Sequence, residues 1–451
     1  MTETNDFKDG KISGIKRFGV LLISLYFSSE DAEKAEKSLK ELKALAQTAL
    51  SGEEHGPDAE YCDFYFMTQC RPAPEAATYL GTGKAEEAAE LCRNRGVELV
   101  IFDCELSPSQ IRNLEKTIAP DGSELRVIDR TMLILDIFAR HAVTGEGKLQ
   151  VEIAQLKYTA PRLTGKGIEM SRQGGASSSG SVGARGPGET KLETDRRHIK
   201  RRIASLEEQL ETLENTRETM RKQRKKSKIP VIAIVGYTNA GKSTLLNRLT
   251  DAGILAENKL FATLDPTVRK LTLPSGMEVL LTDTVGFIND LPHGLVKAFK
   301  STLDEAKYAD LLLILTDASD ENAEMKTAVT EKTLSELGAG DKPTVYVFNK
   351  CDMLAEFPKG SADSEKKAVF ISAGTGEGME NLLSVIEDTL SAFLRKAEFL
   401  FPFDDQAPLN TLYGKASVIS VEYTEDGTLV EALADAATCG ILKKYIKKQG
   451  D

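Results

Sequence analysis

The chain lacks the features of a metal-centred, disulfide-bonded or membrane-spanning protein. Its six cysteines form no Cys-x-x-Cys pair and no metal-binding spacing, a pattern typical of reduced thiols in the cytoplasm. No apolar run approaches the roughly 18 residues of a membrane span. The first residues are polar and acidic, so we expect no signal peptide. These absences predict a cytoplasmic protein and leave peripheral contact with a membrane open.

Positive charge is also scarce over the chain as a whole. The net charge is −11 over 451 residues, which excludes a surface that binds nucleic acid everywhere and confines any such contact to a local segment. This length corresponds to about three domains. A hydrophobic content of 41% is sufficient for packed cores.

Gly236–Thr244, which reads GYTNAGKST, has the pattern of a phosphate-binding loop. The apolar run Ile229–Val235 precedes it, and leucines at helical spacing follow it, so the segment reads as strand, loop and helix. In such a loop, backbone N–H groups point at phosphate oxygens. Lys242 can reach the β- and γ-phosphates, and the Ser243 hydroxyl can bind Mg²⁺. The segment predicts a nucleoside triphosphate without naming the base.

Two later segments are suited to the magnesium ion and the γ-phosphate. Asp283 stands at the end of an apolar strand and begins an Asp-x-x-Gly motif, in which it can hold Mg²⁺ and the Gly286 N–H can meet the γ-phosphate. Residues 260–267 are polar and turn-rich. A hydroxyl there can complete the metal shell, with Thr263 preferred over Thr267.

The base is predicted by Asn349–Asp352, which reads NKCD and follows another apolar strand. The two oxygens of Asp352 suit the N1–H and 2-amino groups of guanine, whereas adenine would leave the carboxylate unpaired. Asn349 and Lys350 would brace the base and the loop. A later strand end, Phe370–Gly374, can bring backbone groups to guanine O6. Motifs in this order at the ends of successive strands indicate a GTP site.

The expected site residues are therefore numerous. The residues expected to bind the nucleotide are Gly236, Tyr237, Thr238, Asn239, Ala240, Gly241, Lys242, Ser243, Thr244, Phe261, Ala262, Thr263, Leu264, Asp283, Thr284, Val285, Gly286, Asn349, Lys350, Asp352, Ser372, Ala373 and Gly374. The expected metal ligands are Ser243, Thr263 and Asp283, and the expected catalytic groups are Lys242, Thr263 and Gly286.

Phe287 occupies the position after the Asp-x-x-Gly glycine. Small GTPases of the Ras type place a water-orienting glutamine there, and phenylalanine cannot perform that task. We therefore expect slow intrinsic hydrolysis, with the missing group or the loop ordering supplied by a partner.

Upstream of this site, residues 15–128 alternate strand and helix candidates after a start, residues 1–14, that we expect to be disordered. The alternation predicts an α/β subdomain with a parallel sheet. Gly81–Lys84 lacks the residue gap of a phosphate loop, so a tight turn before a helix is favoured over phosphate binding. Whether this subdomain binds ATP stays open.

Residues 129–228 have the pattern of an antiparallel helical hairpin. One apolar stripe runs over Leu135–Leu156, and a second begins at Leu192 and follows heptad spacing from Ile199. The tip, residues 164–188, is rich in Gly and Ser and cannot fold alone. It is either a flexible linker or a finger that orders against a polyanion.

Local charge favours the finger. Residues 188–228 carry 13 Lys and Arg against 8 Asp and Glu, a local excess of positive charge in an acidic chain. The candidate RNA contacts are Lys166, Arg172, Arg185, Arg196 and Arg197.

The remaining boundaries place a nucleotide domain at residues 229–398 and a Pro- and Asp-containing linker at 399–410. Residues 411–451 read as strand, turn and helix, which predicts a small α+β domain.

With these motifs together, the sequence resembles the HflX-type GTPases, a translation-factor-related family with a hydrophobic residue in place of the glutamine. The motifs that carry the resemblance are LSPSQIRNLE, LILDIFARHA, LQVEIAQLKY, RGPGETKLETDRR, GYTNAGKST, FATLDPT, DTVGFI and NKCD. The resemblance implies an α/β multidomain protein with an N-terminal α/β subdomain, an antiparallel helical hairpin, a Ras-like P-loop G domain and a small α+β C-terminal domain. It also implies binding to rRNA of the large ribosomal subunit and GTP-dependent splitting or rescue of stalled ribosomes. We further expect Mg²⁺ as cofactor, from the motifs above, and a monomer.

Two other functions stay open from the sequence. One is a GTP-dependent switch that acts on a protein or a membrane-associated partner. The other is RNA modification or ATP-driven remodelling by the N-terminal subdomain, although the sequence offers no catalytic cysteine, histidine pair or metal cluster for modification.

Overall fold

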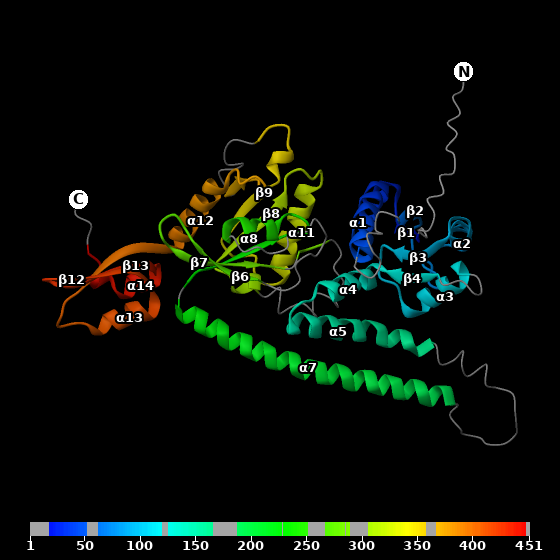
Figure 1. The fold of residues 1–451 in the computed structure, drawn as a ribbon, viewed down its shortest axis with the longest axis horizontal. Helices are drawn as coiled ribbons and strands as arrows, with labels where there is room; N and C mark the ends of the chain where they lie inside the picture. The colour runs from blue at the N-terminus through cyan, green and yellow to red at the C-terminus, as the bar shows by residue number, and fades with distance from the viewer. Residues whose placement is uncertain are drawn as a thin grey trace, which may run out of the picture. The chain divides into compact units, whose positions relative to one another are not determined.

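The structure is a computed structural model, drawn in Figure 1. It describes residues 18–51, 62–119, 125–165, 187–227, 229–250, 267–284, 286–288, 305–357 and 367–447. The expected disordered start, residues 1–14, lies outside these ranges. The chain divides into two compact units, Met1–Ile137 with Tyr158–Arg196, and Phe138–Lys157 with Arg197–Asp451.

The N-terminal subdomain contains a four-stranded parallel sheet, as predicted. Its strands, in the order β2-β1-β3-β4, are β1 (Phe18–Tyr26), β2 (Cys62–Cys70), β3 (Val97–Phe102) and β4 (Arg126–Asp129). The crossover helices are α1 (Ala32–Leu50), α2 (Thr82–Arg95) and α3 (Pro108–Ile118). The central strands β1 and β3 are mostly apolar and buried, which is typical of a parallel sheet with helices on both faces.

Gly81 is the N-cap of α2 and forms a helix start. Its N–H donates to Gln69 Oε1 at 3.0 Å, and Lys84 pairs with Glu87 at 2.9 Å. A Cβ at Gly81 would lie 2.4 Å from the Arg71 guanidinium. The geometry therefore agrees with a tight turn before a helix.

Asp129, at the carboxyl end of β4, is a buried anchor. Its Oδ1 accepts the Met132 N–H at 2.9 Å, and its Oδ2 accepts the Leu106 N–H at 3.0 Å, Arg162 Nη2 at 2.9 Å and the Tyr158 hydroxyl. The Arg162 guanidinium also lies 3.7 Å from the Tyr158 ring centroid. Burial, together with the Asp129 charge, raises the pKa of Tyr158. The carboxylate thus holds residues 158–162 against the sheet.

We expect Asp129→Asn to cost about 2 kcal/mol of local stability, because the charge-assisted bond to Arg162 is lost while an acceptor oxygen remains. Hydrogen exchange of the Leu106 and Met132 amides should accelerate by about thirtyfold. Glu90→Gln, on the exposed face of α2, is the matched control and should change nothing. Unchanged protection in Asp129→Asn would contradict the anchoring role.

The first hairpin stripe forms two helices rather than one. α4 (Arg130–His141) ends before α5 (Gly145–Thr159) begins. The Thr144 hydroxyl accepts the Gly147 N–H at 3.0 Å, so it caps the start of α5. This N-cap, next to Gly145, explains why the single apolar stripe over 135–156 is divided between two helices.

α7 (Pro187–Ser227) pairs with α5, and residues Ala160–Gly165 between them form a short 3₁₀ helix. Glu146, at the start of α5, pairs with Arg217 near the end of α7, whereas Lys157, at the end of α5, pairs with Glu207. This order is antiparallel, as predicted. Leu206 of the heptad stripe is buried.

The nucleotide domain has a six-stranded sheet in the order β10-β9-β8-β5-β7-β6. Its strands are β5 (Val231–Gly236), β6 (Val268–Thr272), β7 (Glu278–Asp283), β8 (Leu311–Asp317), β9 (Thr344–Asn349) and β10 (Ala368–Phe370). Its helices include α8 (Lys242–Thr250), α11 (Ala323–Glu336) and α12 (Met379–Phe393). All strand pairs are parallel except β6 with β7, and β6 is a half-exposed edge strand that the sequence analysis missed.

The expected linker at 399–410 is wrong. β11 (Leu394–Phe401), β12 (Ser417–Thr424) and β13 (Gly427–Asp435) form an antiparallel sheet in the order β11-β13-β12, and α13 (Ala407–Lys415) and α14 (Ala436–Ile441) accompany it. Phe399 and Phe401 are fully buried in its core. The strands of the C-terminal sheet therefore begin at Leu394, before residue 411.

The helix expected after the turn begins later than the sequence predicts, because residues 427–435 form β13 and α14 begins only at Ala436. Val430, Ala432 and Ala434 are all fully buried, which is the period of a strand with one buried face. The α+β class of this domain is as predicted. None of the helices in the described ranges combines the length and apolarity needed to cross a membrane.

Candidate nucleotide-binding site

The loop between β5 and α8 has the backbone of a phosphate cradle. Gly236, Asn239 and Gly241 have φ of 154°, 62° and 96°, which curls the chain back between strand and helix. A Cβ at Gly236 would lie 2.2 Å from the Leu315 carbonyl oxygen, and one at Gly241 would lie 2.3 Å from Asn349 Nδ2. Both positions therefore require glycine.

Lys242, the first residue of α8, is buried inside this loop. Its Nζ donates to the Gly236 oxygen at 3.2 Å and to the Tyr237 oxygen at 2.9 Å. Burial lowers the pKa of Lys242 to about 8, and the nearby Asp283 charge opposes that shift. The ammonium lies where an incoming phosphate would add a negative charge that stabilises its protonated form.

Ser243 and Asp283 lie together beside the cradle. The Ser243 hydroxyl donates to Asp283 Oδ2 at 2.9 Å, and the carboxylate is buried. Mg²⁺ in nucleotide sites uses one or two protein oxygens and completes its shell with phosphate oxygens and water, so this pair fits that ion. Among the described residues no cluster of three or more His, Cys, Asp or Glu side chains could hold a metal without such help.

The segment after β7 lies directly against the phosphate loop. A Cβ at Gly286 would be 2.7 Å from Thr238 Cγ2 and 3.0 Å from Lys242 Nζ, so only glycine allows this approach. The Phe287 N–H donates to the Gly236 oxygen at 3.1 Å, and its carbonyl accepts the Thr238 N–H at 2.9 Å. The Phe287 side chain is fully buried. Its backbone therefore joins the two loops, and its ring offers no group to a water molecule.

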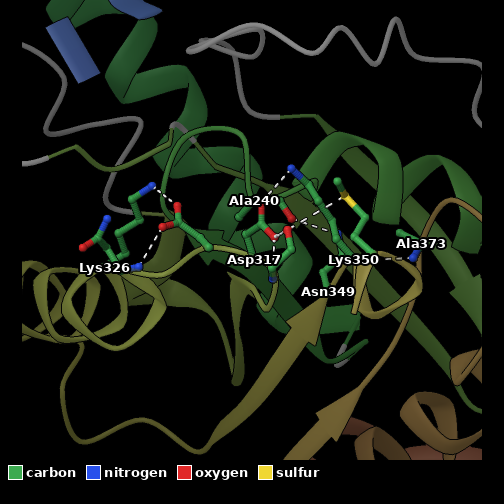
Figure 2. A network of polar contacts seen from close by, with 10 residues as sticks. Ala240, Asp317, Lys326, Asn349, Lys350 and Ala373 are labelled. Atoms are coloured by element: carbon green, nitrogen blue, oxygen red, sulfur yellow. Dashed lines mark hydrogen bonds and ion pairs between the residues drawn. The ribbon is translucent and has the colours of Figure 1, made fainter. Parts of the chain in front are cut away.

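Asn349, at the end of β9, connects the phosphate loop to the segment after β10 (Figure 2). Its Nδ2 donates to the Ala240 oxygen at 2.8 Å, and its Oδ1 accepts the Ala373 N–H at 2.9 Å. Lys350 pairs with Asp317 at 2.8 Å at the neighbouring strand end. The predicted base-side segments are thus brought to one edge of the sheet.

The residues expected to contact the guanine base differ in their exposure and in their hydrogen bonds. Asp352 is exposed in the short helix Cys351–Met353, where its carboxylate is accessible. Of the Phe370–Gly374 backbone groups expected near guanine O6, the Ala373 N–H is bonded to Asn349 in this structure. Ser372 is fully buried, and its hydroxyl accepts the Thr375 N–H at 3.1 Å. Gly374 is the exposed member of the segment.

Comparison with protein-family models covers this chain almost from end to end. The matches are "GTP-binding GTPase N-terminal" at residues 36–139, "GTP-binding GTPase Middle Region" at 141–224, "50S ribosome-binding GTPase" at 231–350 and "HflX C-terminal domain" at 359–438. The GTPase HflX of Caldanaerobacter subterraneus is 50% identical over 378 residues, which is 84% of each chain. That of Escherichia coli is 44% identical over 363 residues, or 80% of this chain and 83% of the other. The chain belongs to the HflX GTPase family.

Among solved structures, the chain is similar to a GTP-binding protein from the archaeon Sulfolobus solfataricus in complex with GDP. The identity is 23%, the TM-score is 0.41, and the match covers 83% of this chain and 99% of the other. Membership of the HflX family makes the protein a GTPase and agrees with the GTP site that the sequence motifs predict.

Two side chains of this HflX-family site were missed by the sequence analysis. Arg248 of α8 donates to the Ala373 and Gly374 carbonyl oxygens, and Asp317 pairs with Lys350. Each partner lies far away in the chain, so no local motif marks the contact. A charged residue at a strand end was the only available signal for Asp317.

Several expected residues lie outside the described residues. They are Phe261, Ala262, Thr263, Leu264 and Val285 of the nucleotide set, and Lys166, Arg172 and Arg185 of the RNA set. Arg196 and Arg197 are described and exposed on α7.

Proposed function

We propose that this HflX-family GTPase binds rRNA of the large ribosomal subunit through its hairpin and tip loop. GTP binding and hydrolysis would be coupled to the splitting or rescue of stalled ribosomes. The observation that carries the proposal is Phe287, which is buried and bonded to the phosphate loop through its backbone. A GTP site with this residue in place of a water-orienting glutamine needs help from a partner.

The hydrolytic step depends on side chains and a backbone N–H that lie together at the phosphate loop. Lys242 would exchange its bonds with the loop carbonyls for phosphate oxygens, and the Gly286 N–H would meet the γ-phosphate. Ser243 and Asp283 would hold Mg²⁺, with Thr263 as the proposed third ligand. The ion would neutralise charge that develops on the phosphate oxygens.

The RNA side of the proposal rests on local charge and exposure. The hairpin segment 188–228 has an excess of five positive charges, and Arg196 and Arg197 are exposed on it. A ribosome offers dense phosphate to such a surface. We further propose that the protein acts as a cytoplasmic monomer.

Purified large subunits should raise GTP turnover by at least about a thousandfold, the lower end of the range seen when a partner completes a GTPase site. Phosphate release with and without large subunits measures this, with small subunits as control. Deleting residues 164–188 should abolish the stimulation and leave intrinsic turnover unchanged. Binding to the subunit should weaken steeply with salt.

No stimulation by large subunits would overturn the proposal. Affinity for another partner that ignores salt and survives the tip deletion would favour the alternative, a GTP-dependent switch on a protein or membrane-associated regulator.

A further inference from the structure

Arg248 joins the helix that follows the phosphate loop to the segment expected at the base. It lies on α8, six residues after Lys242. Its Nε donates to the Ala373 carbonyl oxygen at 3.2 Å, and its Nη2 donates to the Gly374 carbonyl oxygen at 2.5 Å. One guanidinium therefore holds two successive carbonyl groups.

The segment is shaped around this guanidinium. Gly376 has φ of 94°, and a Cβ there would lie 3.4 Å from Arg248 Cζ and Nη2. The Gly376 N–H donates to the Ser372 oxygen at 2.8 Å, and the Ser372 hydroxyl accepts the Thr375 N–H, so residues 372–376 form a closed turn. Arg248 thus grips a preformed turn rather than a loose loop.

The contacts of Arg248 with the two carbonyl oxygens determine the orientation of the peptide group between Ala373 and Gly374. In a trans peptide the C=O and the following N–H point in opposite directions. Holding the Ala373 carbonyl toward α8 therefore directs the Gly374 N–H away from α8. The Ala373 N–H is already bonded to Asn349, which leaves Gly374 as the exposed backbone donor of the turn.

We propose that Arg248 is a positioning residue that couples binding of the phosphates to binding of the base. By holding residues 373–374 it orients the Gly374 N–H toward guanine O6 and slows the release of GDP. Lysine at this position cannot reproduce the two-pronged contact, because it presents a single ammonium. The inference rests on the assignment of this segment to the guanine base.

Arg248→Ala should raise the dissociation rate of fluorescent GDP by about tenfold in stopped-flow displacement, while the association rate stays within about twofold. The GDP dissociation rate of Arg248→Lys should lie between those of Arg248→Ala and the unmodified protein. Arg269→Ala, an exposed arginine on β6 of the same domain, is the matched control and should behave as the unmodified protein.

A second readout separates positioning from general weakening of the fold. The ratio of GDP to ADP affinity should fall about tenfold in Arg248→Ala, because only guanine has the O6 acceptor. Loss of both affinities to the same degree, or an unchanged GDP dissociation rate, would overturn the proposal. If the unmodified protein does not prefer GDP to ADP, the assignment of residues 372–374 to guanine is refuted, and with it the role of Arg248. Subunit-stimulated turnover, measured separately, tests the ribosomal function.

Discussion

Lys242→Ala is expected to lower the affinity for GDP and GTP by about a thousandfold. Lys242 is the buried cation of the phosphate loop, and its Nζ is already held by the Gly236 and Tyr237 carbonyls. A charge contact with phosphate at about 4 Å is worth roughly 4 kcal/mol at the effective dielectric of a partly shielded site. That energy corresponds to about a factor of a thousand in the dissociation constant.

Isothermal titration with GDP measures this loss directly. Lys270→Ala is the matched control, since Lys270 pairs with Glu278 on the exposed side of the β6–β7 pair and should not affect binding. Circular dichroism shows whether the altered protein remains folded. Affinity retained within tenfold in a folded Lys242→Ala protein would refute the placement of the phosphates in this loop.

Asp352→Asn is expected to reverse the base preference. The carboxylate presents two acceptors to the N1–H and 2-amino donors of guanine, whereas an amide would face that amino group with a donor of its own. Removing one partner of a charge-assisted contact that is desolvated on binding costs a few kcal/mol, so GTP affinity should fall by about a hundredfold. Xanthine carries an oxygen in place of the 2-amino group, and XTP affinity should rise.

Competition of GTP and XTP against fluorescent GDP measures the reversal. The gain for XTP is the decisive readout, because a misfolded protein cannot acquire a new ligand. Asp341→Asn, at an exposed position of the same domain, should keep the original preference. Unchanged selectivity for guanine in Asp352→Asn would show that another group reads the base.

Some features of the fold follow from local pattern alone. The alternation of apolar runs and helices predicts the parallel N-terminal sheet, because the central strands of such a sheet are buried on both faces and are mostly apolar. The C-terminal domain did not follow in this way. Phe399 and Phe401 lie in a short stretch beside Pro and Asp, and only the opposing strand β13 shows that they are core residues.

The same division holds for the site. Gly236, Lys242 and Ser243 fall within a few contiguous residues, so spacing alone reveals the phosphate loop. Asp283 and Asn349 stand at strand ends, and the carboxyl ends of parallel strands meet at one edge of a sheet. The order of strands and motifs along the chain is therefore sufficient to place these residues together.

By itself, the sequence determined that this protein has a GTP site with Phe287 in the glutamine position, because those residues lie in contiguous motifs with fixed geometry. Only the tertiary structure decided how the site is braced. Arg248 and Gly374 are 126 residues apart, and Asn349 and Ala240 are 109 apart. A contact over such a separation leaves no periodicity or spacing in the chain, since it exists only when the folded sheet brings the two segments together. For the phosphate loop this adds a specific feature: its helix carries the arginine that holds the segment expected at the base.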